Sequence, residues 1–210
     1  SDAKVILFVG RITPDKGVRE LISAFSRIKN DGSNAHLILI GPFDEGSGVS
    51  NSISKNEIIA MPELHLIGYS DCPEKYMSIS DILCLPSYRE GFGTVVIEAA
   101  AMGIPTVGSD IYGLTDAVVH GETGVLVPPE DVDALYEGIS LLLSDQLLCK
   151  KLGQSAKERA EKWFSADRVN DGVAKEYHRL LQVFSPFCEL IEQRGMLDCI
   201  AWNMKIVPPH

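Results

Sequence analysis

Residues 82–109, ILCLPSYREGFGTVVIEAAAMGIPTVGS, decide the fold class of this chain. They open on a short apolar run at 82–86 that predicts a buried strand, and they close on a second strand-like run at 105–109. Between these runs a helix-like segment at 94–102 ends at Gly103, a residue type that commonly terminates helices. A strand, a helix and another strand in this order are typical of a parallel sheet covered by helices.

The same alternation of strand-like and helix-like segments continues on both sides of this stretch. Apolar runs at 4–10, 35–41, 64–68 and 124–127 predict further strands, giving about six short parallel strands. Apolar residues spaced for one helical face follow the first strand and recur after residue 131: Val18, Leu21, Ile22, Phe25 and Ile28; Val132, Leu135, Ile139 and Leu142; Val169, Val173, Tyr177, Leu180 and Phe184. The sequence therefore predicts an α/β, Rossmann-like three-layer domain with a helical carboxy-terminal end.

We expect one domain over residues 1–184 and an apolar, poorly patterned tail over 185–210. The large apolar side chains of the tail would be costly to leave in water. The sequence leaves open whether they pack on this domain or on one that is missing. Residues 42–57 are polar and rich in glycine and serine, which predicts a mobile loop after the second strand.

The composition excludes several classes of protein. Twenty-nine acidic and 19 basic residues give a formal net charge of −10, whereas general nucleic-acid binders and proteins of anionic membranes need a basic face. Any anionic ligand must therefore be bound locally. The sequence contains no long apolar run and no signal-like start, so we expect neither a membrane span nor secretion.

The five cysteines form no C-x-x-C pair, which argues against a disulfide framework and against a zinc site. A reducing cytoplasm is the compartment that this cysteine usage favours. Cys84 lies inside the apolar run at 82–85, where we expect a small buried hydrophobe.

The first junction that carries chemistry is GRITPDKG at residues 10–17, between a strand and a helix. Arg11 follows the strand end and Lys16 stands at the start of the helix. A guanidinium and an ammonium over one helix N-terminus indicate an anion site, most naturally one for a diphosphate. The alternative is a pair of solvated surface cations, with Asp15 as a partner.

The second junction, SYREGFGTVVIE at residues 87–98, precedes the helix-like segment. Gly91 and Gly93 let the backbone approach a ligand closely, and the N–H groups from Gly93 to Val95 begin the helix, which together form a phosphate cradle.

Two glutamates flank this cradle. Glu90 can accept hydrogen bonds from sugar hydroxyls, and Glu98 lies on the same helix face as Thr94, where a vicinal diol such as a ribose would supply two donors. The alternative for Glu90 is a solvent-facing charge beside Arg89, and for Glu98 a capping or ion-pair residue.

Competing motifs are absent. A dinucleotide fingerprint would need glycine at Val96, and a Walker motif would need lysine at Ser109. The five histidines show no metal-ligand spacing, so we expect structural or surface roles for them and no metal site.

Three segments together, VGRITPDKG, LPSYREGFGTVVIEAAAMGIPTVGSD and HGETGVLVPP, resemble the carboxy-terminal donor-binding domain of family 4 glycosyltransferases, which have the GT-B fold. The resemblance covers about residues 4–184. It implies transfer of a sugar, with retention of configuration, from a nucleotide-diphosphate donor to a hydroxyl, without a catalytic metal or other cofactor.

The resemblance also implies a role for each matching position. Arg11 and Lys16 would hold the diphosphate, Glu90 would meet the donor sugar, and Glu98 would take the ribose hydroxyls. The loop with Tyr69 and Ser70 would lie near the base. The implied catalytic residues are Arg11, Lys16 and Glu90, and the implied substrate-binding residues are Gly10, Arg11, Lys16, Tyr69, Glu90, Gly91, Phe92, Gly93, Thr94, Val95 and Glu98.

Two departures from the family pattern leave individual contacts open. Members often carry Gly-Gly followed by Pro-Glu where this chain has Tyr112-Gly113-Leu114-Thr115-Asp116, and many have leucine in place of Thr94.

Complete members also carry an amino-terminal Rossmann-like domain that binds the acceptor. We therefore expect this chain to be the donor half, inactive alone, of an enzyme that uses a uridine-linked sugar. By resemblance, the parent enzyme would build capsule or lipopolysaccharide in the cytoplasm, at the inner face of the plasma membrane. The alternative from another class is a non-catalytic nucleotide-sugar-binding or interaction module with the same fold. A phosphorylase would need a cofactor lysine site that the sequence does not offer.

Overall fold

The computed structural model describes residues 3–43, 58 and 61–193, and for residues 182–193 it describes the backbone alone. The chain divides into two compact units, Ser1–Lys162 and Trp163–His210. The boundary expected between residues 184 and 185 stays a prediction. Of the loop expected at 42–57, only residues 42 and 43 are described. Of the tail expected at 185–210, only residues 185–193 are described, as the end of a helix.

The first unit is built on a six-stranded parallel sheet with the strand order β3-β2-β1-β4-β5-β6. The strands are β1 (Lys4–Val9), β2 (Ala35–Ile40), β3 (Leu64–Gly68), β4 (Ile82–Leu85), β5 (Thr106–Ser109) and β6 (Gly124–Val127). Each begins and ends within one residue of the run that predicts it. The predicted α/β, Rossmann-like class and the six parallel strands are therefore confirmed.

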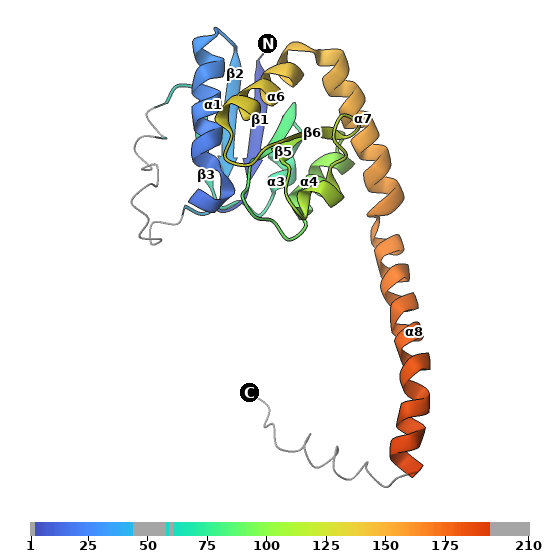
Figure 1. Ribbon diagram of the computed structural model, residues 1–210. Helices are drawn as coiled ribbons and strands as arrows, with labels where there is room; N and C mark the ends of the chain where they lie inside the picture. The colour runs from blue at the N-terminus through green and yellow to red at the C-terminus, as the bar shows by residue number, and fades with distance from the viewer. Residues whose placement is uncertain (1–2, 44–57, 59–60, 194–210) are drawn as a thin grey trace. The chain divides into compact units, whose positions relative to one another are not determined.

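Helices connect and cover these strands. The first unit contains the short helix η1 (Pro14–Lys16), α1 (Val18–Asn30), α3 (Pro73–Met77), α4 (Thr94–Ala101), α5 (Leu114–Ala117), α6 (Val132–Ser144) and, except for its last residue, α7 (Gln146–Trp163). β1 is followed by α1 and pairs on one side with β2, whereas β4 is followed by α4 and pairs on the other side with β5. Because parallel crossovers are right-handed, α1 and α4 lie on opposite faces of the sheet. α6 packs beside α1, and α3 packs beside α4 (Figure 1).

The apolar face predicted for the first helix is buried, because Val18, Leu21, Ile22, Phe25 and Ile28 of α1 all pack into the core. β4 is buried along its whole length, as expected for a central strand covered on both faces. Its Cys84 is fully buried, and this burial raises the pKa of the thiol. Cys84 is thus the small buried residue that its apolar context predicts.

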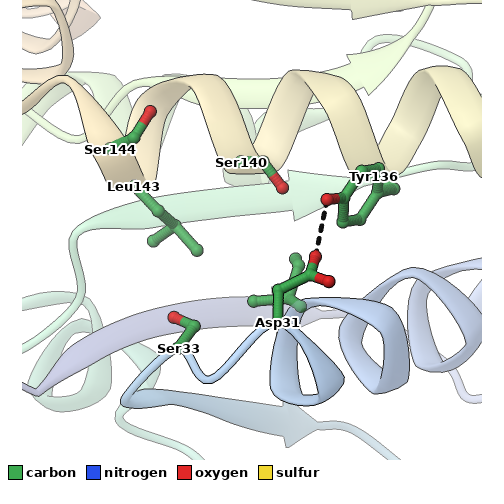
Figure 2. Close-up of a pocket in the computed structure, with 7 residues that line it drawn as sticks. Asp31, Ser33, Tyr136, Ser140, Leu143 and Ser144 are labelled. Carbon is green, nitrogen blue, oxygen red and sulfur yellow. Dashed lines mark hydrogen bonds between the residues drawn. The ribbon is translucent and has the colours of Figure 1, made fainter.

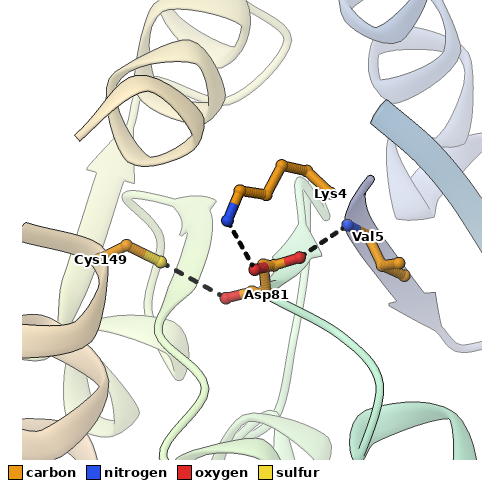
Figure 3. A network of polar contacts seen from close by, with 4 residues as sticks. All are labelled: Lys4, Val5, Asp81 and Cys149. Atoms are coloured by element: carbon orange, nitrogen blue, oxygen red, sulfur yellow. Dashed lines mark hydrogen bonds and ion pairs between the residues drawn. The ribbon is translucent and has the colours of Figure 1, made fainter. Parts of the chain in front are cut away.

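Asp81, which directly precedes β4, forms hydrogen bonds with residues of β1 (Figure 3). Its carboxylate accepts hydrogen bonds from the Val5 N–H at 2.8 Å and from Lys4 Nζ at 3.3 Å. Its carbonyl oxygen accepts a hydrogen bond from Cys149 Sγ of α7 at 3.5 Å. These contacts at the amino ends of the two central strands set the register in which their opposite ends meet.

The second unit contains α8 (Ala166–Gln193), which confirms the predicted helical ending. Among the residues described, no helix is both long enough and apolar enough to cross a membrane. Cys72, Cys84 and Cys149, the cysteines whose side chains the structure describes, form no disulfide.

Candidate functional site

The candidate site lies where the order of the strands reverses. β1 and β4 are neighbours, and the sheet grows from this pair to β3 on one side and to β6 on the other. In open α/β sheets, ligands bind at such a switch point, outside the carboxyl ends of the strands. The two junctions singled out in the sequence, 10–17 and 87–98, follow these two strands directly. The topology therefore brings the two predicted halves of the site together.

Close backbone contacts hold the two junctions against each other. Gly17 has a φ of +65°, which favours glycine, and a Cβ atom built on it would lie 2.0 Å from the carbonyl oxygen of Pro86. The N–H of Tyr88 donates a hydrogen bond of 2.9 Å to the carbonyl oxygen of Asp15. The loop after β1 and the loop after β4 thus touch through their main chains.

Lys16 and Glu90 form an ion pair across this contact. Lys16 Nζ lies 2.5 Å from Glu90 Oε1 and 3.4 Å from the carbonyl oxygen of Arg89. Both paired side chains are only 15% exposed. The structure therefore does not support a solvated surface cation paired with Asp15, the alternative left open for Lys16.

Ser87 is a further member of this cluster that sequence reasoning missed. It is fully buried two residues beyond β4, and its hydroxyl donates a hydrogen bond of 2.8 Å to the same oxygen, Glu90 Oε1. Among the described residues, no hydrogen bond or ion pair reaches Glu90 Oε2. The carboxylate is thus held at one oxygen, while the other can accept hydrogen bonds from a ligand.

Arg11 is exposed just beyond β1, and no hydrogen bond or ion pair joins its guanidinium to the described residues; its carbonyl oxygen accepts a hydrogen bond of 3.1 Å from the Thr13 N–H. Gly10, which precedes it, is half-buried. Arg11 is therefore not engaged with the Lys16–Glu90 pair, although it belongs to the same junction.

The N-terminus of α4 opens onto the same end of the sheet. Gly93 stands before the helix with a φ of +67°, and no side chain caps the helix. The first N–H groups of a helix have no partner within it, so those of Thr94 and Val95 are available to an anion. Thr94 is exposed and Val95 half-buried, which is compatible with the predicted cradle.

The loop after β5 packs against the backbone of this cradle. A Cβ atom on Gly113 would lie 2.5 Å from the carbonyl oxygen of Glu90 and 2.7 Å from that of Gly91. The φ of Gly113 is +91°, so glycine is required here on both grounds. The neighbouring Tyr112, where many family members have a further glycine, is 85% exposed.

Glu98 is exposed on α4, as is Thr94 on the same helix face. Because it is exposed, Glu98 does not need the partner that a buried carboxylate would require. It borders a cavity of about 350 Å³. The other residues that line this cavity are Pro73, Glu74 and Met77 of α3, and Met102. The cavity places Glu98 at a concave surface rather than on an open helix face.

The structure does not join Tyr69 to this cluster by any hydrogen bond or ion pair between described residues. Tyr69 follows β3 at the edge of the sheet and is 75% exposed. A hydrogen bond to Asp71, together with the charge of that carboxylate, raises the pKa of its phenol. Phe92, the other aromatic residue predicted for the site, lies partly exposed between the two cradle glycines.

Another cavity, of about 250 Å³, lies between α1 and α6 (Figure 2). Asp31, Ser33, Tyr136, Ser140 and Ser144 line it, and the Tyr136 hydroxyl donates a hydrogen bond of 2.6 Å to Asp31. This cavity lies at the carboxyl-terminal end of α1, close to the amino ends of the strands. The two junctions lie at the other end of the sheet, at the carboxyl ends of the strands.

No group of three or more histidine, cysteine, aspartate or glutamate side chains suited to a metal ion occurs in the described part of the chain. His36 and His65 form a stacked pair on β2 and β3, with their ring nitrogens 3.1 Å apart.

The chain is similar to known proteins. A family model described as "Glycosyl transferases group 1" matches residues 1–159. The capsular polysaccharide biosynthesis glycosyltransferase CapM of Staphylococcus aureus is 34% identical over 185 residues, which are 87% of this chain and 48% of CapM.

Solved structures agree with this match. Sucrose-phosphate synthase from Thermosynechococcus elongatus has a TM-score of 0.74 and 30% identity, covering 86% of this chain and 46% of that one. HepE from Anabaena, in complex with UDP and glucose, has a TM-score of 0.76 over 84% of this chain and 48% of its own; at 22% identity this likeness concerns the fold alone. The chain spans about half the length of the relatives that it matches.

Proposed function

The chain belongs to the glycosyl transferases group 1 family, as its three motif segments predict, and from this premise we propose that it is the donor-binding half of a retaining glycosyltransferase. The ligand in this proposal is a nucleotide-diphosphate sugar with uridine as its base. The observation that carries the proposal is the meeting of Lys16 and Glu90 beside the uncapped N-terminus of α4. A cation, a carboxylate and free N–H groups suit a diphosphate joined to a sugar.

The proposed chemistry depends on charge that grows on the departing diphosphate. As the bond between the sugar and the phosphate breaks, negative charge accumulates on the phosphate oxygens. Lys16, Arg11 and the N–H groups at Thr94 and Val95 would stabilise that charge at fixed positions. In other enzymes a divalent cation supplies this stabilisation. Because groups of the protein supply it here, the proposal includes no catalytic metal.

The remaining groups would recognise the ligand. Glu90 would accept hydrogen bonds from the donor sugar through Oε2, the oxygen without a partner in the described structure. Glu98, at its cavity beside α3, would accept hydrogen bonds from the ribose hydroxyls. Tyr69 would lie near the base, an assignment that rests on the family resemblance.

The acceptor lies outside this chain in our proposal. A separate amino-terminal domain of the same protein would bind it, and the isolated chain would not turn over. Support comes from the coverage, since the chain accounts for 48% of CapM. The name of that relative favours capsule or a similar surface polysaccharide as the product. Its assembly at the inner face of the plasma membrane is a proposal that rests on the family resemblance.

Calorimetric titration of the 210-residue chain with UDP, GDP and ADP tests the proposal. We expect saturable binding, strongest for UDP, and a loss of about tenfold or more in Lys16→Met, because a charge-assisted contact to phosphate is removed. The matched control is Lys29→Met: Lys29 is also partly buried and paired with a glutamate, Glu63 at 3.6 Å, but it lies at the opposite end of α1. Absence of saturable binding to all three nucleotides, or equal losses in both variants, would overturn the proposal.

The same titration examines metal independence. We expect the affinity for UDP to be the same in EDTA and in magnesium. An affinity that appears only with magnesium would show that Lys16, Arg11 and the helix N-terminus do not suffice for the diphosphate.

A further inference from the structure

We propose that Ser87 is a positioning residue that keeps Glu90 oriented toward the donor sugar after a diphosphate has engaged Lys16. The inference rests on the proposed function, because it assigns a partner role within that same site. Ser87 itself would touch neither the sugar nor the phosphate.

The geometry assigns this role through one oxygen atom. Glu90 Oε1 accepts two hydrogen bonds, one from Lys16 Nζ at 2.5 Å and one from Ser87 Oγ at 2.8 Å. Two donors on one oxygen fix the rotation of the carboxylate, and they leave Oε2 without a partner among the described residues. The carboxylate is therefore presented with one oxygen anchored and the other available.

The two anchors differ in what a ligand does to them. Lys16 is 15% exposed and carries the positive charge that a diphosphate attracts, so a bound diphosphate competes with Glu90 for its ammonium group. Ser87 is fully buried and lies two residues beyond the central strand β4. Its hydroxyl cannot be recruited in the same way. When the ion pair weakens, the serine is the anchor that remains.

A merely structural role for Ser87 makes a different prediction. A buried hydroxyl that only stabilises the loop would, when removed, weaken all ligands of the site equally. If Ser87 instead orients Glu90, its removal affects only ligands that carry a sugar. The ratio of the dissociation constants for a UDP-sugar and for UDP distinguishes the two roles.

Calorimetry on the 210-residue chain measures this ratio with UDP and with UDP-glucose, UDP-galactose and UDP-N-acetylglucosamine. For the UDP-sugar that the wild type binds, we expect Ser87→Ala to raise the ratio by about tenfold, the fold-change expected for a hydrogen bond to a charged group, while UDP itself changes by less than about twofold. Glu90→Gln should raise the ratio similarly. The double variant should raise it no further, because both changes remove the same interaction.

Two further variants complete the test. Ser87→Thr retains a hydroxyl and should restore most of the wild-type ratio. Ser109→Ala is the matched control: Ser109 is also buried at the end of a strand, β5, but its hydroxyl has no partner among the described residues, so the ratio should not change.

The outcomes separate the two proposals. A wild type that binds neither UDP nor any UDP-sugar overturns the proposed function and this inference with it. A wild type that binds UDP but none of the three UDP-sugars overturns the inference alone, as does a Ser87→Ala variant that weakens UDP and the UDP-sugar equally. An unchanged ratio in Ser87→Ala overturns it as well.

Discussion

Gly17 packs directly against Pro86, so that a Cβ atom added to the glycine would lie 2.0 Å from the proline carbonyl oxygen. This contact joins the loop after β1 to the loop after β4. It sets the distance between Lys16, which precedes Gly17, and Glu90, which follows the same strand as Pro86. The ion pair at the centre of the candidate site thus depends on a glycine that carries no chemistry.

Gly17→Ala should therefore lower stability and weaken UDP binding together. The variant adds a methyl group where the backbone leaves no room and where φ is +65°, so we expect a loss of about 2 kcal/mol or more in the free energy of unfolding. Urea denaturation and calorimetry with UDP measure the two effects. Gly32→Ala is the control, since Gly32 has a φ of +83° with nothing within 4 Å of the added Cβ. It should lose about 1 kcal/mol, the usual cost of a left-handed conformation, and bind UDP normally. Equal behaviour of the two variants would contradict the role of the contact.

The Lys16–Glu90 pair should show thermodynamic coupling. Both side chains are 15% exposed, so breaking the pair should cost about 1–3 kcal/mol, between the values for surface and for buried pairs. We expect Lys16→Met alone to destabilise, because it leaves the carboxylate with Ser87 as its remaining partner. The double variant Lys16→Met/Glu90→Gln should recover part of that loss, because no unpaired charge remains. Urea denaturation of the four proteins gives the coupling free energy, and strict additivity would show that the pair contributes nothing to stability.

The strands and the two junctions could be predicted from sequence because each depends on local pattern. Every side chain of the run at 82–86 is apolar, as expected for a central strand buried on both faces, and β4 is such a strand. Gly103 ends its helix for a local reason too, its left-handed φ of +77°. The meeting of the junctions also followed, because strands interrupted by helices build a parallel sheet whose carboxyl ends lie at one edge.

The partners within the site could not be predicted in this way. Ser87 stands in a segment of many polar residues, and only the backbone path places its hydroxyl on Glu90 rather than in water. The same holds for Lys16, whose sequence neighbour Asp15 looks like the natural partner, while the actual one is 74 positions away. Gly113 supports the loop at Glu90 and Gly91 from another junction, a contact for which no local pattern exists.

Glu98 should contribute to nucleotide binding and not to folding. It is exposed, and its carboxylate has no hydrogen bond or ion pair within the described structure, so Glu98→Gln should change the free energy of unfolding by less than about 0.5 kcal/mol. If Glu98 accepts hydrogen bonds from the ribose, the affinity for UDP should fall by about tenfold. The preference for UDP over 2′-deoxy-UDP should shrink at the same time.

The neighbouring glutamate provides the comparison for this variant. Glu74→Gln removes a carboxylate from the rim of the same cavity and should leave both affinities unchanged. If the Glu98→Gln variant binds UDP with the same affinity as the wild type, the proposed contact between Glu98 and the ribose is wrong.

Tyr88 should make stability depend on alkaline pH. Burial raises the pKa of its phenol to about 12, with Glu20 as the next cause, from an ordinary value of 10. A pKa raised by folding means that the folded state favours the protonated phenol, so the stability it contributes is fully present below pH 10. That contribution is lost as the pH rises from 10 toward about 12.

In urea denaturation at pH 9, 10, 11 and 12, the difference in free energy of unfolding between the wild type and Tyr88→Phe should therefore shrink across this range. Glu20→Gln should reduce the pH dependence without abolishing it, because burial is the larger cause. A difference that stays constant from pH 9 to 12 would mean that Tyr88 titrates alike in the folded and the unfolded chain, which its half-buried position in the second junction argues against.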